Sequence, residues 1–166
     1  MSQEILILSG PVHCGKTSLL QNWIINRQKI AGFLTPDIEG ERFFLNVDNK
    51  ELFPMNASAD EAVILKTGRF SFSSSNFQRA SATLMDACNS MAYNELLIDE
   101  IGPIELNKQD GFYSALLYVL SKPDPLHRLI LVVREQCLEK AIHLINNYPC
   151  KVKVCSTADF RLKAGN

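Results

Sequence analysis

Apolar and polar positions alternate along the chain in two ways that predict two kinds of element. Short, nearly continuous apolar runs recur at strand length, and longer stretches between them carry apolar residues at helical spacing. The expected strands cover residues 5–8, 31–35, 95–98, 128–133 and 151–155. The expected helices cover residues 17–28, 76–91, 110–121 and 136–146. Strands that alternate with helices favour a three-layer α/β fold with a mainly parallel five-stranded sheet between two layers of helices.

The segment 41–72 breaks this alternation. Its short apolar runs, within 42–47, 51–55 and 62–65, are interrupted by turn-forming residues such as Asp48-Asn49, Pro54 and Gly68. We therefore expect a small antiparallel β insertion, made of hairpins, within a single domain that spans residues 1–166. A polar stretch follows, and Asn76 is the expected N-cap of the next helix.

A glycine-rich segment directly after the first strand carries the most specific pattern in the chain. A glycine at each end lets the backbone curl so that its N–H groups point toward an anion, which also faces the N-terminus of the following helix. In such a P-loop, or Walker A motif, Lys16 reaches the β- and γ-phosphates of a nucleoside triphosphate, and Thr17 offers its hydroxyl to Mg²⁺. The predicted nucleotide-binding residues are Gly10, Pro11, Val12, His13, Cys14, Gly15, Lys16, Thr17 and Ser18.

The expected strand at 95–98 ends in two carboxylates, as a Walker B element does. We expect Asp99 to hold Mg²⁺ directly or through water, and Glu100 to orient or deprotonate the water that attacks the γ-phosphate. P-loop ATPases with a glutamate at this place usually insert another strand between the two motif strands, which predicts the sheet order 5-1-4-3-2. The end of the strand at 128–133 would then bring Arg134 near the phosphates, as a sensor or as a stabiliser of transition-state charge.

A GTPase alternative depends on two short matches. The residues Asp99 to Gly102 fit the DxxG pattern, and the residues Asn107 to Asp110 fit the NKxD pattern. In GTPases a further strand and helix separate these patterns, whereas here only four residues intervene and no apolar strand precedes Asn107. We interpret 107–110 as a polar turn whose Asp110 can start the next helix.

Composition limits the partners and the compartment. The chain has 166 residues and a formal net charge of −1, so no basic excess favours a nucleic acid or a membrane surface as partner. The longest apolar runs are strand-sized and no signal sequence precedes the first strand, so we expect a cytoplasmic protein. The five cysteines form no CxxC pair and their number is odd, which argues against a disulfide framework and a zinc site.

These motifs together resemble the nucleoside-triphosphatases of the THEP1 type, also called the cancer-related NTPase family. Family members usually carry GPPGVGKTT in the loop, where this chain has GPVHCGKTS, and DEIGKMEL after the Walker B strand, where it has DEIGPIEL. The resemblance implies a RecA-like core and Mg²⁺-dependent hydrolysis of NTPs such as ATP or GTP to NDP and phosphate, with loose base selectivity. It also places Glu105 near the site. Further matching residues are Gly32, Phe33, Thr35, Gly40, Arg42 and Phe112.

Departures from the family pattern keep other functions open. Val12-His13 replaces the family's Pro-Gly, so a side chain stands where glycine is usual, and a positive φ there would be costly. His13 could contact a phosphate or face solvent. The family's Arg-x-Gly-Phe becomes Arg42-Phe43-Phe44-Leu45, which leaves the contacts to the base open. The alternatives are a nucleotide-dependent binding or regulatory module with little hydrolysis, and a small-molecule or nucleotide kinase whose acceptor lies beneath the 41–72 insertion.

Overall fold

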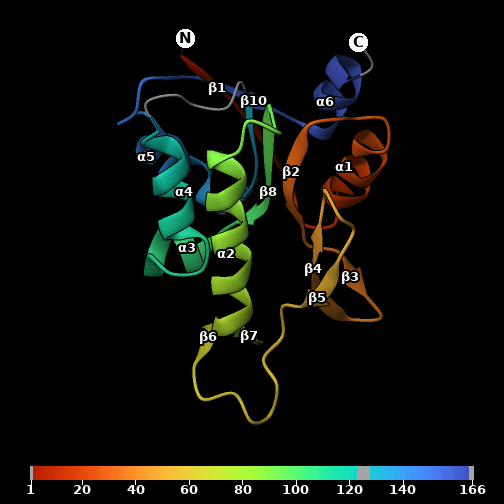
Figure 1. Ribbon diagram of the computed structural model, residues 1–166, viewed down its shortest axis with the longest axis vertical. Coiled ribbons are helices and arrows are strands. Elements are labelled where there is room, and N and C mark those ends of the chain that lie inside the picture. The colour runs from red at the N-terminus through yellow and green to blue at the C-terminus, as the bar shows by residue number, and fades with distance from the viewer. Residues whose placement is uncertain (1, 123–127, 165–166) are drawn as a thin grey trace.

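A mostly parallel sheet forms the centre of the computed structural model, which describes residues 2–122 and 128–164 (Figure 1). Its parallel strands stand in the order β10-β1-β9-β8-β2, which is the predicted order 5-1-4-3-2. The predicted α/β fold is confirmed, and the carboxyl ends of the two motif strands and of the strand between them meet at one edge. These strands are β1 (Gln3–Gly10), β2 (Ile30–Leu34), β8 (Glu95–Ile101), β9 (Arg128–Arg134) and β10 (Cys150–Cys155).

Beyond the five parallel strands, three antiparallel strands extend this sheet past β2 to eight strands, and most of them come from the predicted β insertion. β4 (Glu41–Asn46) pairs antiparallel with β2, and both β3 (Asp37–Ile38) and β5 (Leu52–Pro54) pair with β4. The chain turns back directly after β2 and therefore covers the edge that β2 would otherwise expose. The rest of the predicted insertion, β6 (Ile64–Thr67) and β7 (Phe70–Ser73), forms a separate two-stranded sheet.

Alternate residues of the parallel strands pack into two layers of apolar core. On β9, Leu129 and Leu131 belong to one layer, whereas Ile130 and Val132 belong to the other. Because helices cover both faces, the strands are apolar on both faces, which explains their continuous apolar sequence. The first layer includes α2 (Ser74–Asn89), α4 (Tyr113–Leu120) and α5 (Leu138–Ile145), and the second includes α1 (Lys16–Ile24) and α6 (Thr157–Ala164), which lie on opposite sides in Figure 1.

The helix starts differ from the predicted ones at two places. The Ser73 hydroxyl accepts a hydrogen bond from the Asn76 amide at 3.1 Å and caps α2, so the predicted N-cap at Asn76 is wrong. The predicted start at Asp110 is also wrong, because α4 begins at Tyr113. A short helix that was not predicted, α3 (Pro103–Lys108), lies before it and is capped by Gln109 at φ 54. The apolar spacing did not predict α3, which has only six residues, or α6, whose eight residues include few apolar ones. None of the described helices is long and apolar enough to cross a membrane.

An aromatic cluster fixes the β4–β5 hairpin against the rest of the fold. Phe44 of β4 is fully buried, and its ring centroid lies 5.8 Å from that of Phe33 and 5.0 Å from that of Phe77. Phe53 of β5 and Phe112 pack against Phe44 at 5.2 and 5.6 Å. Such ring contacts add to the burial of apolar area. The hairpin is therefore held firmly enough to carry functional side chains to the carboxyl edge of the sheet.

Candidate functional site

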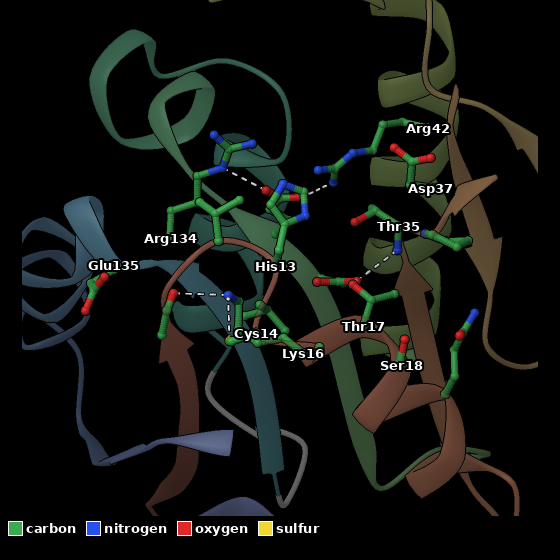
Figure 2. Close-up of a pocket in the computed structure, with 18 of the residues that line it drawn as sticks. His13, Cys14, Lys16, Thr17, Ser18, Thr35, Asp37, Arg42, Arg134 and Glu135 are labelled. Carbon is green, nitrogen blue, oxygen red and sulfur yellow. Dashed lines mark hydrogen bonds and ion pairs between the residues drawn. The ribbon is translucent and has the colours of Figure 1, made fainter. Parts of the chain in front are cut away.

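The glycine-rich loop joins β1 to α1 at the carboxyl edge of the parallel strands. Gly15 caps α1 at φ 82, a left-handed conformation that glycine adopts without strain. The loop borders a cavity of about 750 Å³, which is also bordered by Asp99 and Glu100 of β8 and by Arg134 of β9 (Figure 2). The strand order alone therefore gathers the predicted motifs around one space.

Lys16 is folded back over this loop. Its ammonium group donates to the carbonyl oxygens of Gly10 and Pro11 at 3.0 and 2.8 Å and lies 3.4 Å from Cys14 Sγ. The positive charge already lies over the loop, and phosphate oxygens can replace these neutral carbonyls as stronger acceptors. Every predicted loop residue except Pro11 borders the cavity, and Pro11 supplies a carbonyl oxygen to Lys16.

His13 occupies a strained backbone position in the loop. Its φ of 61 lies in the left-handed region, where a residue with a Cβ costs about 1–2 kcal/mol. The position where the family has glycine does have a positive φ, so the replacement by His13 carries the strain expected from the sequence. The imidazole is exposed at the cavity and projects between Arg42 and Arg134 in the view of Figure 2.

Asp99 lies at the bottom of the cavity, where it is almost fully buried. Its Oδ2 accepts hydrogen bonds from the Thr17 hydroxyl at 2.9 Å and from the Thr35 amide at 3.0 Å. Burial and the neighbouring charge of Glu100 raise the pKa of Asp99 to about 6, against the opposing effect of these two donors. The Thr35 hydroxyl oxygen is itself buried and has no hydrogen-bond partner among the described residues. This group of hard oxygen atoms joins the two predicted motifs.

The backbone of β8 is irregular where it reaches the cavity. Ile98 pairs with Leu131 and Ile101 with Val133, so β8 has one residue more than β9 over this interval. Glu100 lies within this bulge at φ 81, which is rare for a residue other than glycine. The extra residue lets both Ile98 and Ile101 pack in the same apolar layer while Asp99 and Glu100 between them border the cavity.

Two arginines hold the Glu100 carboxylate from opposite sides. Arg134 at the end of β9 donates from Nε to Oε1 at 2.7 Å, and Arg42 of β4 donates from Nη1 to Oε2 (Figure 2). Burial alone would raise the pKa of Glu100, but the two guanidinium groups outweigh it and hold that pKa below its usual value. Glu100 is therefore an ionised carboxylate in this arrangement.

Glu105 lies behind this site and has a buried carboxylate. Its oxygens accept hydrogen bonds from the Gly102 amide at 3.0 Å and from the Phe112 amide at 3.1 Å. Burial raises the pKa of Glu105 to about 7 despite these donors. Glu105 does not border the large cavity, but it fixes the turn that follows Glu100. The resemblance placed Glu105 near the site, and the structure shows it buried directly behind Glu100.

A family model described as NTPase matches residues 5–158 of the sequence. The chain belongs to the NTPase family. It is similar to the solved structure of THEP1 from Aquifex aeolicus, with a TM-score of 0.70 and 14% identity over 98% of this chain and 95% of that chain. It is also similar to a human cancer-related nucleoside triphosphatase, with a TM-score of 0.65 and 21% identity over 92% and 88% of the two chains. No curated protein matches the sequence. The predicted resemblance and the P-loop NTPase fold are thereby confirmed, and the chain is a nucleoside triphosphatase in this general sense.

The GTPase-like patterns do not form a base-binding site in this NTPase. Asn107 and Lys108 belong to α3, and neither borders the cavity. Lys108 donates instead to the Lys66 carbonyl, and Asn107 accepts from Lys140 at 2.5 Å. The NKxD match therefore covers the end of α3 and the residues just after it, so the expected polar turn over 107–110 is only partly correct.

Sequence reasoning missed the second wall of the cavity as part of the site. Thr35 and Arg42 border it, together with Gln21, Pro36, Asp37, Glu135 and Gln136. Thr35 follows β2 directly, and polar residues at the carboxyl ends of parallel strands are natural site candidates, so this signal was available. Arg42 matches the family pattern, but its position on a strand gives no signal that it belongs to the site, because it reaches Glu100 across 58 residues of sequence through a hairpin.

Proposed function

We propose that this NTPase hydrolyses nucleoside triphosphates to diphosphates and phosphate in a Mg²⁺-dependent reaction with broad base selectivity. The hydrogen bond from Thr17 to Asp99, 82 residues apart in sequence, carries the proposal because it unites the P-loop and the Walker B carboxylate at one cavity. A cavity of about 750 Å³ is large enough for a nucleotide.

The loop binds the triphosphate in this proposal. The N-terminus of α1 and the loop amides attract the β- and γ-phosphates, and the Lys16 ammonium exchanges the Gly10 and Pro11 carbonyls for phosphate oxygens. Neither Asn107 nor Lys108 borders the cavity, which favours loose selectivity for the base.

Thr17 and Asp99 would hold the Mg²⁺. The fit is good, because their oxygens already lie 2.9 Å apart and the nearby buried Thr35 hydroxyl has no hydrogen-bond partner among the described residues. Mg²⁺ prefers such hard oxygen ligands together with substrate phosphates. When bound, the ion neutralises charge on the β- and γ-phosphates.

Glu100 positions the attacking water, and Arg134 stabilises the charge that develops on the γ-phosphate. An ionised carboxylate that is fixed on two sides can accept a hydrogen bond from water and orient it. Arg134 borders the cavity and bonds Glu100, so its guanidinium can face the γ-phosphate while it stays close to the Glu100 carboxylate.

The size of the space beneath the insertion favours water over a larger acceptor. A second cavity lies between Glu100, Phe72 and Phe77, and its volume is only about 30 Å³. This is room for about one water molecule and not for a small-molecule acceptor. Hydrolysis is therefore favoured over a kinase reaction.

A nucleotide-dependent regulatory module is the second candidate. It is favoured by the two ion pairs that occupy Glu100 and by the strained His13 in the loop. Such a module would bind nucleotides tightly but release little phosphate, and Glu100 could be replaced without effect on binding.

The test is phosphate release from ATP, GTP, CTP and UTP, each with Mg²⁺ and with EDTA. We expect release from all four with Mg²⁺, and none above background with EDTA or in the Lys16→Ala variant. Glu100→Gln should bind nucleotide and release little phosphate, whereas wild-type protein that binds nucleotide and releases no more phosphate than Lys16→Ala would support the regulatory module instead.

A further inference from the structure

Arg42 is a cationic side chain at the cavity that the proposed mechanism uses only to hold Glu100. It comes from β4 in the hairpin that follows β2, whereas Arg134 comes from the end of β9. Both side chains border the same cavity as the P-loop, and Figure 2 shows them approaching it from opposite sides. The Arg42 side chain is only 19% exposed, so its charge is partly withdrawn from water.

The hydrogen bonds of the two arginines leave much of each guanidinium available. Among the described residues, Arg42 bonds Glu100 through Nη1 and Arg134 bonds it through Nε. A guanidinium group has five N–H donors in a planar fork that matches a carboxylate or a phosphate. Each arginine can therefore bind a second anion in the cavity, or exchange Glu100 for one.

The incoming γ-phosphate is the anion that suits this place. Lys16 and the loop residues border the same cavity as the two arginines and Glu100. A terminal phosphate on the loop would bring more negative charge to the arginines than the single carboxylate they now share. Charge-assisted bonds to that phosphate are strong because the groups are partly buried.

Resting on the proposed function, we propose that Arg42 is a second catalytic arginine, which binds the γ-phosphate opposite Arg134 when a triphosphate enters. The chain then supplies from its own hairpin the positive charge that many P-loop enzymes receive from a partner protein. In the reaction, the water oxygen forms a bond to the γ-phosphorus as the bond from that phosphorus to the bridging oxygen breaks. The diphosphate leaves with the electron pair, and the water proton passes to Glu100 and then to the released phosphate.

The competing explanation is that Arg42 only holds Glu100 in place. The chain offers a matched control, because Arg27 forms the same kind of ion pair with Glu95 at the opposite end of β8, at 3.1 Å. Arg27 does not border the cavity of the P-loop. The Arg27→Ala variant should therefore show what it costs the fold to remove one of the two arginines that hold a glutamate, without any effect on a bound γ-phosphate.

The experiment compares Arg42→Ala, Arg42→Lys and Arg27→Ala in the full chain. We would measure kcat and KM for ATP, and the affinities for ADP and for AMPPNP, an ATP analogue that resists hydrolysis. Arg42→Ala should lower kcat about 100-fold or more and weaken AMPPNP binding about tenfold, with ADP affinity within about twofold of wild type. Arg42→Lys should recover part of the AMPPNP affinity but little of kcat, because an ammonium lacks the fork. Arg27→Ala should match the wild type in all of these.

Three results separate the possible failures. If Arg42→Ala keeps the wild-type kcat and AMPPNP affinity, the proposal for Arg42 is wrong. If it weakens ADP and AMPPNP binding equally, with a melting temperature below that of Arg27→Ala, Arg42 has only a structural role. If wild-type protein releases no more phosphate than Lys16→Ala, the proposed hydrolysis fails, and the difference between the ADP and AMPPNP affinities still decides whether Arg42 contacts the γ-phosphate.

Discussion

The strand β8 carries a glutamate between two arginines at each of its ends, and the two arrangements differ in what surrounds them. At its start, Glu95 accepts from Arg27 and Arg128, each at 3.1 Å. At its end, Glu100 accepts from Arg42 and Arg134. The ion pairs alone do not distinguish a structural site from a functional one.

The backbone and the neighbouring cavity make the distinction. Glu95 lies in regular parallel pairing with Ile30 on one side and Arg128 on the other, whereas Glu100 lies in a bulge at φ 81. The cavity of about 310 Å³ beside Glu95 contains charges that pair with one another, among them Arg128 with Glu4 at 3.0 Å. The cavity beside Glu100 is lined by the P-loop. Strain kept at a ligand-sized cavity points to function, because relaxed pairing would be more stable.

The largest difference between the two ends is expected when each glutamate is made neutral. Glu100→Gln should lower kcat for ATP about 10²- to 10⁴-fold, because the water loses the carboxylate that orients it and accepts its proton. Glu95→Gln should change kcat by less than about threefold, since its neighbourhood has no part in phosphate chemistry. Steady-state phosphate release measures both. Equal losses in the two variants would show that the comparison reflects stability alone.

A pH-dependent difference in stability is expected from Glu105, which supports only the Glu100 end. Its folded pKa of about 7 lies above the ordinary value of 4.5, so the folded protein binds this proton more tightly than the unfolded chain. The unfolding free energy should therefore fall as the pH rises from about 4.5 through 7, by up to about 3 kcal/mol from this group.

Urea denaturation between pH 4.5 and 8 measures this effect against the Glu105→Gln variant. Asp99 has a raised pKa too and acts in the same direction, so the informative quantity is the difference between wild type and variant. As the pH rises, the unfolding free energy of the wild type should fall relative to that of the Glu105→Gln variant. A difference that does not change with pH would mean that Glu105 has no raised pKa.

The strand order and the two motifs could be predicted from sequence because their signals are local. Lys16 and Thr17 follow a glycine pattern, and Asp99 and Glu100 end an apolar run. The predicted strand order places both segments at the same edge of the sheet, where they border one cavity. Arg42 could not be placed in this way, because its contact depends on a hairpin whose position is fixed by the packing of Phe44 and Phe53. The bulge that carries Glu100 was equally invisible, since an extra residue in one strand is defined only by its partner strand.

A smaller effect on stability is expected from removing one arginine at the structural end. Arg27→Ala should lower the unfolding free energy by about 1 kcal/mol, because Arg27 pairs with Glu95 and its guanidinium lies 3.9 Å from the centre of the Trp23 ring. Arg42→Ala should cost no more than this, since Glu100 keeps Arg134 and loses a contact in a strained segment. Thermal and urea unfolding compare the two variants. A clearly larger loss in Arg42→Ala would make the Glu100 end the more structural of the two.

The smallest effect is expected from relieving strain at single backbone positions, and it separates strain in general from strain at the loop. His13 in the P-loop and Lys29 before β2 have nearly the same φ, 61 and 59, and the Lys29 carbonyl accepts from the Glu95 amide at 3.2 Å. Replacing either residue by glycine removes a strain of about 1–2 kcal/mol from the folded state. Glycine also makes the unfolded chain more flexible, which costs about 0.5–1 kcal/mol on folding, so both variants should gain about 0.5–1 kcal/mol of stability. Only His13→Gly should change ADP affinity, because only His13 borders the nucleotide cavity. Loss of stability in His13→Gly alone would mean that the imidazole makes a favourable contact that outweighs its strain.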